Sequence, residues 1–167
     1  MEFLEAKNKF IQTWGALGTQ WGINKTMAQI HALLMIVPQP ISMEEIMEEL
    51  QISRGNASMN LRALMEWGIV YKEYKSGERR EFFTAEKNLD ELAIKIAQER
   101  SKREIKPALK VLKEVSSLQK MDTEAQAHFV DQTQKLYSFV LKADNVLEKI
   151  TEYKDNWLTQ LLIKFIK

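Results

Sequence analysis

Cysteine is absent from the 167 residues of this sequence. Its absence excludes disulfides, thiolate-bound zinc, iron–sulfur clusters and a cysteine nucleophile, and it is typical of a reducing compartment. Histidine is almost as scarce, because His31 and His128 are the only two, too few for a site built on several imidazoles. The sequence also lacks a glycine-rich phosphate loop and a Ser/His/Asp order. It therefore predicts no metal site, no cofactor and no enzymatic activity.

Glycine and proline are rare as well, with 6 and 3 residues, which favours long helices joined by few loops. No stretch approaches the ~18 consecutive apolar residues that a membrane span requires. The first ten residues, MEFLEAKNKF, include acidic side chains, whereas a signal peptide begins with basic residues followed by an apolar run. We therefore expect a cytoplasmic, mainly α protein that does not contact membranes.

Positive and negative side chains are nearly equal in number, with 24 Lys and Arg against 23 Asp and Glu. Hydrophobic residues make up 45% of the chain, the proportion of a folded globular protein. A net charge of +1 indicates no partner by itself, so any electrostatic signal lies in how the charges are distributed.

Two helices are predicted at the start of the chain. Aromatic and aliphatic residues at helical spacing predict the first over 2–20. Asn24 is suited to cap the second, over 25–37, because its short side chain accepts from the free amides of a first turn. Pro38 and Pro40 end this second helix.

Two further helices follow, with a serine before each. Ser42 and Glu45 have the spacing of a capping box, which predicts a short third helix that ends at Leu50. Ser53 is suited to cap a fourth helix, which ends before Gly68, a residue suited to the left-handed position after a helix.

The hydrophobic period then changes to that of strands. Residues 69–75 and 79–84 are rich in β-branched and aromatic side chains and flank Gly77, which predicts a β-hairpin. From residue 88 onward no glycine occurs, and the chain is predicted to be helical again.

The second half is predicted to consist of three helical segments. We expect a long helix over 88–120 with a kink near Pro107, because a proline inside a helix removes one hydrogen bond. Another starts at Asp122 and ends near Ile150, with apolar residues at near-heptad spacing. A short amphipathic segment over 155–166 follows.

The order helix, helix, turn, helix, hairpin over 24–84 is that of a winged helix-turn-helix. In such a unit the fourth helix is the recognition helix and the hairpin is the wing. The sequence therefore predicts a mainly α protein with a winged helix-turn-helix DNA-binding domain at 1–87. A helical dimerisation region is predicted at 88–167.

The fourth helix has one apolar face and one polar face. On a helical wheel Ala57, Leu61 and Leu64 fall on the face that must be core. The opposite face carries small, polar and flexible residues: Gly55, Ser58, Met59, Arg62 and Glu66, flanked by Asn56 and Asn60. Asn pairs bidentately with adenine and Arg with guanine in the major groove. A polar outer face is also what any surface helix has.

The distribution of charge favours the DNA-binding interpretation. Residues 53–80 contain six basic and three acidic side chains, whereas the helix over 42–50 has four glutamates and no base. Lys75, Arg79 and Arg80 gather at the tip of the hairpin, where packing does not require them. We expect the wing and the helix start at Ser53 to contact phosphates, and the carboxylates of the acidic helix to face away from DNA.

The stretch ISRGNASMNLRAL at 52–64, followed by WGIV at 67–70, resembles the MarR-like winged-helix regulators. The run Ser-Arg-Gly-Asn-x-Ser, the upstream Leu-Gly-x-x-Trp-Gly at 17–22 and the Gly-Glu-Arg-Arg wing are most similar to the GbsR branch. The resemblance implies a dimeric bacterial or archaeal transcription regulator, often a repressor and sometimes ligand-responsive. It places Arg54, Asn56, Ser58, Met59, Asn60 and Arg62 at recognition positions and Arg79 and Arg80 on the wing.

Two features admit two interpretations each. The apolar stripes after residue 87 are covered either by a second copy of the chain, as in most symmetric dimers, or within an intramolecular bundle. The aromatic residues are either core or a cage for a quaternary ammonium ligand, and the resemblance makes choline-like effectors the class to name. The cage residues would include Trp14, Trp21 and Tyr137.

The prediction is thus a homodimeric transcriptional regulator, a repressor, that binds a palindromic operator in double-stranded DNA. The predicted DNA contacts are Ser53, Arg54, Asn56, Ser58, Met59, Asn60, Arg62, Lys75, Arg79 and Arg80. The alternative is a winged-helix protein-interaction module that binds no duplex.

Overall fold

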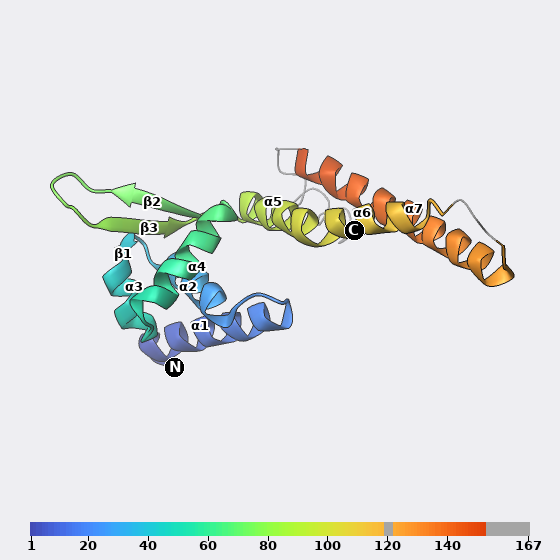
Figure 1. Cartoon of the computed structure of the whole chain (residues 1–167). Helices are drawn as coiled ribbons and strands as arrows, with labels where there is room; N and C mark the ends of the chain where they lie inside the picture. Colours follow the sequence, from blue (N-terminus) through green and yellow to red (C-terminus); the bar gives the residue numbers. More distant parts are fainter. Residues whose placement is uncertain (119–121, 153–167) are drawn as a thin grey trace, which may run out of the picture. The chain divides into compact units, whose positions relative to one another are not determined.

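The computed structural model describes residues 1–118 and 122–152. The chain divides into two compact units, Met1–Leu92 and a second that begins at Ala93. The first unit combines helices with a small antiparallel sheet, whereas helices make up the described residues of the second (Figure 1). The predicted segment over 155–166 lies outside the described residues.

Four helices form most of the first unit. They are α1 (Phe3–Gln20), α2 (Lys25–Ile36), α3 (Met43–Leu50) and α4 (Arg54–Glu66). Each lies within one residue or so of its predicted bounds, because local capping chemistry sets most of their ends.

The predicted caps are confirmed. The side chain of Asn24 accepts from a first-turn amide of α2 at 3.2 Å, and that of Ser53 accepts from the amide of Asn56 at 3.3 Å. At the start of α3 the amide and the hydroxyl of Ser42 both donate to the Glu45 carboxylate, at 2.7 and 2.6 Å. These two hydrogen bonds hold the pKa of Glu45 below its usual range.

The sheet has three strands in the order β1-β3-β2: β1 (Ile41–Ser42), β2 (Val70–Tyr74) and β3 (Glu81–Ala85). The predicted hairpin β2–β3 is confirmed, with Gly77 at a φ of 82° in its turn. The sequence did not predict β1. Its two residues are too few for a periodic pattern, and it forms only because it pairs with the distant β3, with Ser42 opposite Phe82.

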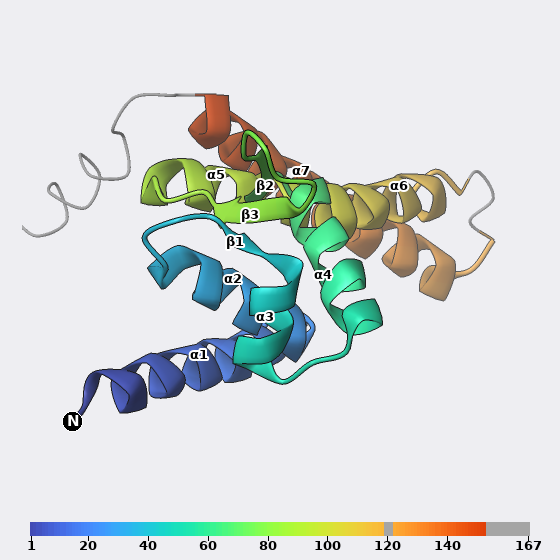
Figure 2. The same ribbon diagram turned by 90° about the vertical axis from the view of Figure 1, so that its left-hand side faces the viewer.

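Helix α2 lies at the centre of the first unit and packs against α1, α3, α4 and β3 (Figure 2). Its apolar residues Met27, Ile30, Leu33 and Leu34 are all buried. The largest fully buried side chains of the first unit come from α2, α3, α4, β2 and β3: Ile30, Leu33, Leu34, Ile46, Leu61, Leu64, Val70 and Phe83.

Helix α1 buries a face that contains two glycines. Its buried residues are Ile11, Gly15 and Gly18, at the spacing of one helical face. A Cβ at Gly18 would lie 2.5 Å from the Cβ of Ala28, so α1 and α2 approach each other closely through small residues. The predicted aromatic stripe of α1 lies largely outside this contact, and Phe3 is exposed.

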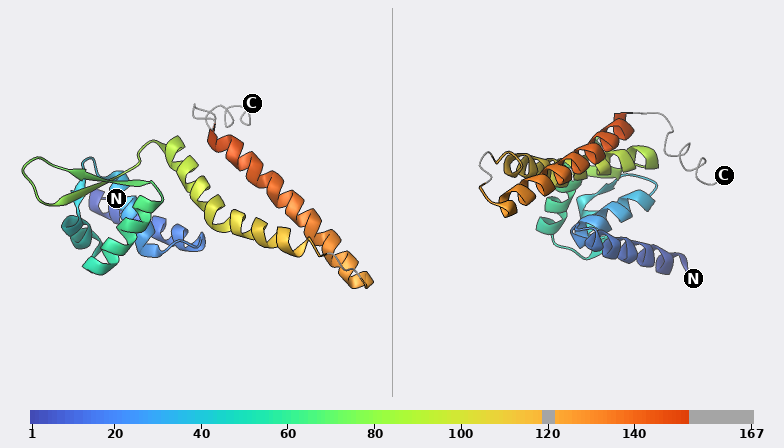
Figure 3. Two further views of the ribbon diagram at one scale, coloured as in Figure 1. Left: turned by 45° about the horizontal axis from the view of Figure 1, so that its top comes forward. Right: turned by 90° about the vertical axis from the view of Figure 1, so that its right-hand side faces the viewer.

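The long helix predicted over 88–120 is interrupted. It consists of α5 (Leu89–Arg100), a π-helical turn η1 (Ser101–Ile105) and α6 (Lys106–Val115). Pro107 follows this π turn closely, and because a proline has no N–H to bond to the preceding turn, the irregularity lies near Pro107 as predicted. Figure 3 shows the bend between α5 and α6.

Helix α7 (Glu124–Glu152) starts two residues after the predicted Asp122 and packs along α6 and η1. The Ser101 hydroxyl donates to the Asp144 carboxylate at 2.6 Å, and both side chains are buried. On the surface nearby, Lys106 and Glu148 form an ion pair at 3.0 Å, which raises the pKa of Lys106. The π turn is therefore fixed to α7 by polar contacts.

Within the described residues, every helix is too short or too polar to cross a lipid bilayer.

Candidate nucleic-acid interface

The two faces of α4 lie as the helical wheel predicts. Ala57, Leu61 and Leu64 are at most 1% exposed and form the inner face. On the outer face Arg62 is exposed and Met59 is 60% exposed, while Ser58 is half-buried. A Cβ at Gly55 would meet nothing within 4 Å, so this part of the helix surface is open to an approaching duplex.

The prediction for Asn60 is wrong, because this side chain is only 3% exposed and cannot reach a base edge. Its Nδ2 donates to the backbone oxygen of Asn56 at 2.9 Å and to the Asn56 Oδ1 at 2.7 Å. The Nδ2 of the half-buried Asn56 in turn donates to the Thr26 hydroxyl at 3.4 Å. The two asparagines thus belong to a polar network that joins α4 to α2.

This network changes the role of Asn56. Its side-chain oxygen accepts from Asn60 and its amide nitrogen donates to Thr26, so both ends are already engaged in the free protein. Thr26 could not be predicted as a partner of Asn56, since the contact spans 30 residues. Asn56 keeps one Nδ2 hydrogen for a contact with DNA, in an orientation that this network sets.

The start of α4 presents a serine cap and an arginine. Ser53 is exposed at the N-cap, and the amides of the first turn lie where a phosphate could accept from them. Arg54, the first residue of the helix, forms an ion pair through its Nη2 with Oε1 of Glu44 in α3. One carboxylate of the acidic helix thus lies beside the start of α4.

Two of the three predicted basic residues of the wing pack on one ring. The Lys75 Nζ lies 3.9 Å from the centroid of the buried Phe82, and the Arg80 guanidinium lies 5.6 Å from it. Arg80 also forms an ion pair with Glu78 at 2.7 Å, and this hydrogen bond raises the pKa of Arg80. The tip of the wing is thus ordered by cation–π contacts as well as by its strands.

The predicted arginines differ in what they already bind. Arg54 and Arg80 are paired with glutamates of the same chain. Arg62 and Arg79 form no ion pair or side-chain hydrogen bond with any residue that the structure describes, and both are exposed. These two guanidinium groups are the ones that a duplex would meet unpaired.

The candidate effector residues lie in both units. Trp14 is half-buried in α1 and stacks on Phe10, with ring centroids 5.6 Å apart, and Trp21 is exposed at the C-cap of the same helix. Tyr137 is half-buried in α7 of the second unit.

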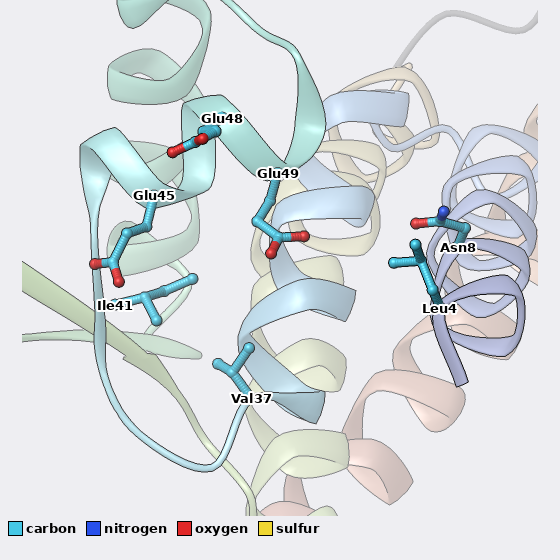
Figure 4. A pocket seen from close by; sticks show the side chains of 7 residues that line it. All are labelled: Leu4, Asn8, Val37, Ile41, Glu45, Glu48 and Glu49. Carbon is cyan, nitrogen blue, oxygen red and sulfur yellow. The ribbon is translucent and has the colours of Figure 1, made fainter. Parts of the chain in front are cut away.

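A cavity of about 460 Å³ lies between α1 and α3, and none of the three candidate effector residues lines it. Figure 4 shows Glu45, Glu48 and Glu49 on the α3 side of this cavity, with Leu4 and Asn8 opposite. Glu49 forms an ion pair with Lys7 at 2.6 Å. Three of the four α3 glutamates therefore line this cavity.

Comparison with known proteins supports the fold. Residues 21–81 match the model of the MarR family. A crystal structure of a transcriptional regulator has 17% identical residues and a TM-score of 0.59, over 86% of this chain and 99% of that one. A mutant of MepR from S. aureus, bound to an oligodeoxyribonucleotide, has 17% identity and a TM-score of 0.42, over 82% and 94% of the two chains. No curated protein sequence matches.

The family match covers the helix-turn-helix and most of the wing. Together with the order of α2, α3, α4, β2 and β3, it confirms the predicted mainly helical, winged helix-turn-helix fold and the resemblance to MarR-like proteins.

Proposed function

We propose that this protein is a transcription regulator that binds double-stranded DNA through α4 and the wing. The observation that supports the proposal most is the exposed outer face of α4, where Arg62 has no partner among the described residues. In a major groove its guanidinium would donate two hydrogen bonds to one guanine base. The Met59 side chain would contact a thymine methyl. The inner face of the same helix is fixed by packing, so these side chains are held outward by a rigid support.

The phosphates would be contacted from two sides of this helix. Ser53 and the free amides at the start of α4 suit one phosphate, and the basic wing residues Lys75, Arg79 and Arg80 suit others across the adjacent groove.

We also propose that the protein belongs to the GbsR branch. We propose that it acts as a repressor, since a dimer bound to a promoter excludes polymerase. Trp14, Trp21 and Tyr137 are the proposed effector contacts, for a ligand such as a quaternary ammonium.

We propose further that two copies associate through α7. The inner face of this helix contains the buried Val130 and Asp144 and packs within the second unit. A second apolar row runs beside it and is exposed, at heptad-like intervals of seven, three, four and three residues: Phe129, Leu136, Phe139, Ala143 and Val146. A row of this spacing suits a second helix, and a second copy supplies an identical one across a two-fold axis.

The function is tested by selecting bound sequences from random duplex and measuring affinity against salt. A DNA reader that neutralises several phosphates should lose affinity steeply, on the order of a thousandfold between 50 and 200 mM salt for about six contacts. The selected sequence should be a palindrome with half-sites about 10 base pairs apart. Absence of duplex binding at about 50 mM salt would contradict the proposal and favour the interaction module.

Self-association is tested with Phe139→Ala. The ring is 71% exposed in the single chain, so its removal should leave the fold intact and weaken dimerisation about tenfold, the loss typical of one aromatic anchor. Tyr74→Ala is the matched control, because Tyr74 is 73% exposed on the wing, away from α7 in the sequence. Light scattering across a dilution series should show the change for Phe139 alone, and equal dimer stability in all three proteins would contradict the α7 interface.

A further inference from the structure

The ion pair between Glu44 and Arg54 joins the two helices of the helix-turn-helix. Both side chains are well exposed, at 50% for Glu44 and 68% for Arg54, so the pair lies at the surface rather than in the core. Glu44 is in the first turn of α3, and Arg54 is the first residue of α4. A carboxylate thus lies beside the end of α4 that is best suited to hold a phosphate.

The other three glutamates of α3 have different surroundings. Glu45 accepts from Ser42, Glu49 pairs with Lys7, and Glu48 lines the cavity next to α1. In the described part of the chain, Glu44 is the α3 carboxylate that binds a basic residue of α4. The position of Glu44 therefore has a consequence for α4 that the neighbouring charges do not share.

We propose that Glu44 limits the affinity of the protein for DNA by competing with a phosphate for Arg54. This inference rests on the proposed function. A phosphate that approaches the start of α4 must either displace the Glu44 carboxylate from the guanidinium or share the guanidinium with it. In both cases the carboxylate stays near a second negative group, which opposes binding.

The effect does not depend on base sequence, because phosphates are the same along the duplex. Glu44 therefore weakens binding to every duplex by a similar factor, while Arg62 and Met59 keep their preference for particular bases. An exposed ion pair contributes little in water, so we expect a factor of about 3 to 10. Glu44 thus lowers the affinity for non-specific DNA without changing the preferred operator sequence.

The test compares Glu44→Gln with Glu48→Gln. Both variants remove one negative charge from an exposed position of α3, but only the first releases Arg54. Affinity for the selected duplex and for an unrelated duplex is measured by fluorescence anisotropy at about 50 and 150 mM salt. Glu44→Gln should bind both duplexes about 3 to 10 times more tightly, with a salt slope steeper by up to about 1, and Glu48→Gln should change affinity less than twofold.

An Arg54→Ala background completes the test. Without the guanidinium, Glu44→Gln should gain no more affinity than Glu48→Gln does. Equal gains from the two glutamine variants in the unchanged background would mean a general charge effect and overturn the inference. Weaker binding by Glu44→Gln would overturn it too, because Glu44 would then position Arg54 for DNA. If the unchanged protein binds no duplex, the proposed function itself fails and this inference falls with it.

Discussion

The double variant Arg62→Ala, Arg79→Ala is expected to bind its selected duplex about a hundredfold more weakly than the unchanged protein. Loss of a bidentate contact between Arg62 and guanine should cost ~1–3 kcal/mol and relax the preference at one base pair of each half-site. Loss of Arg79, a phosphate contact, should weaken binding to all duplexes and lower the salt slope by about 1. Both side chains are exposed and unpaired among the described residues, so no internal contact is broken.

The matched control is Lys110→Ala, Lys113→Ala in α6. It also removes two exposed positive charges, but from the second unit rather than from α4 and the wing. We expect this control to lose less than about threefold in affinity. For both double variants, the free energy of unfolding should stay within about 0.5 kcal/mol of that of the unchanged protein. If the α6 variant loses as much affinity as the α4 and wing variant, DNA is bound by the second unit and the proposed interface is wrong.

Acid is expected to destabilise the first unit through His31. The ring is 4% exposed in α2, and its Nε2 has no hydrogen-bond partner among the described residues. Burial lowers the pKa of His31 from 6.5 to about 4. The unfolded chain therefore binds a proton near pH 6.5 that the folded protein does not bind until about pH 4. Between these values, the free energy of unfolding falls as the pH falls.

The expected loss is about 2 kcal/mol between pH 7 and pH 5, and roughly 3 kcal/mol over the full interval. Urea unfolding followed by circular dichroism at several pH values measures it. Glu45 does not interfere, because its lowered pKa removes stability only below the usual carboxyl range. His31→Leu and His31→Gln should both abolish the decline between pH 7 and pH 5. An unchanged decline in the two variants would show that another group is responsible.

Much of the fold could be predicted because short-range chemistry determines it. Asn24, Ser42 and Ser53 cap helices through hydrogen bonds to amides three residues on, and Gly77 supplies the positive φ of a hairpin turn. These features need no knowledge of distant residues. The core face of α4 follows in the same way from its period.

The features that could not be predicted depend on contacts across long sequence separations. A helical wheel places Asn60 near the outer face, but the position of α2 against α4 decides that it is buried. The pairing of Arg54 with Glu44 likewise depends on how α3 crosses the start of α4. The kink near Pro107 could be predicted, but its form as a π turn over Ser101–Ile105 could not.

Ser42 takes part in three elements of the first unit. It pairs with Phe82 of the wing, caps α3 through its hydroxyl, and donates a hydrogen bond from its amide to the Glu45 carboxylate. The wing and the helix-turn-helix are thereby joined directly at one residue, with no flexible linker between them. If the protein binds DNA as proposed, this contact restrains the distance between the wing and the outer face of α4, and a duplex whose groove dimensions differ would have to deform to fit it. Because stiffness varies with base sequence, this rigidity would select among operators at base pairs that no side chain touches.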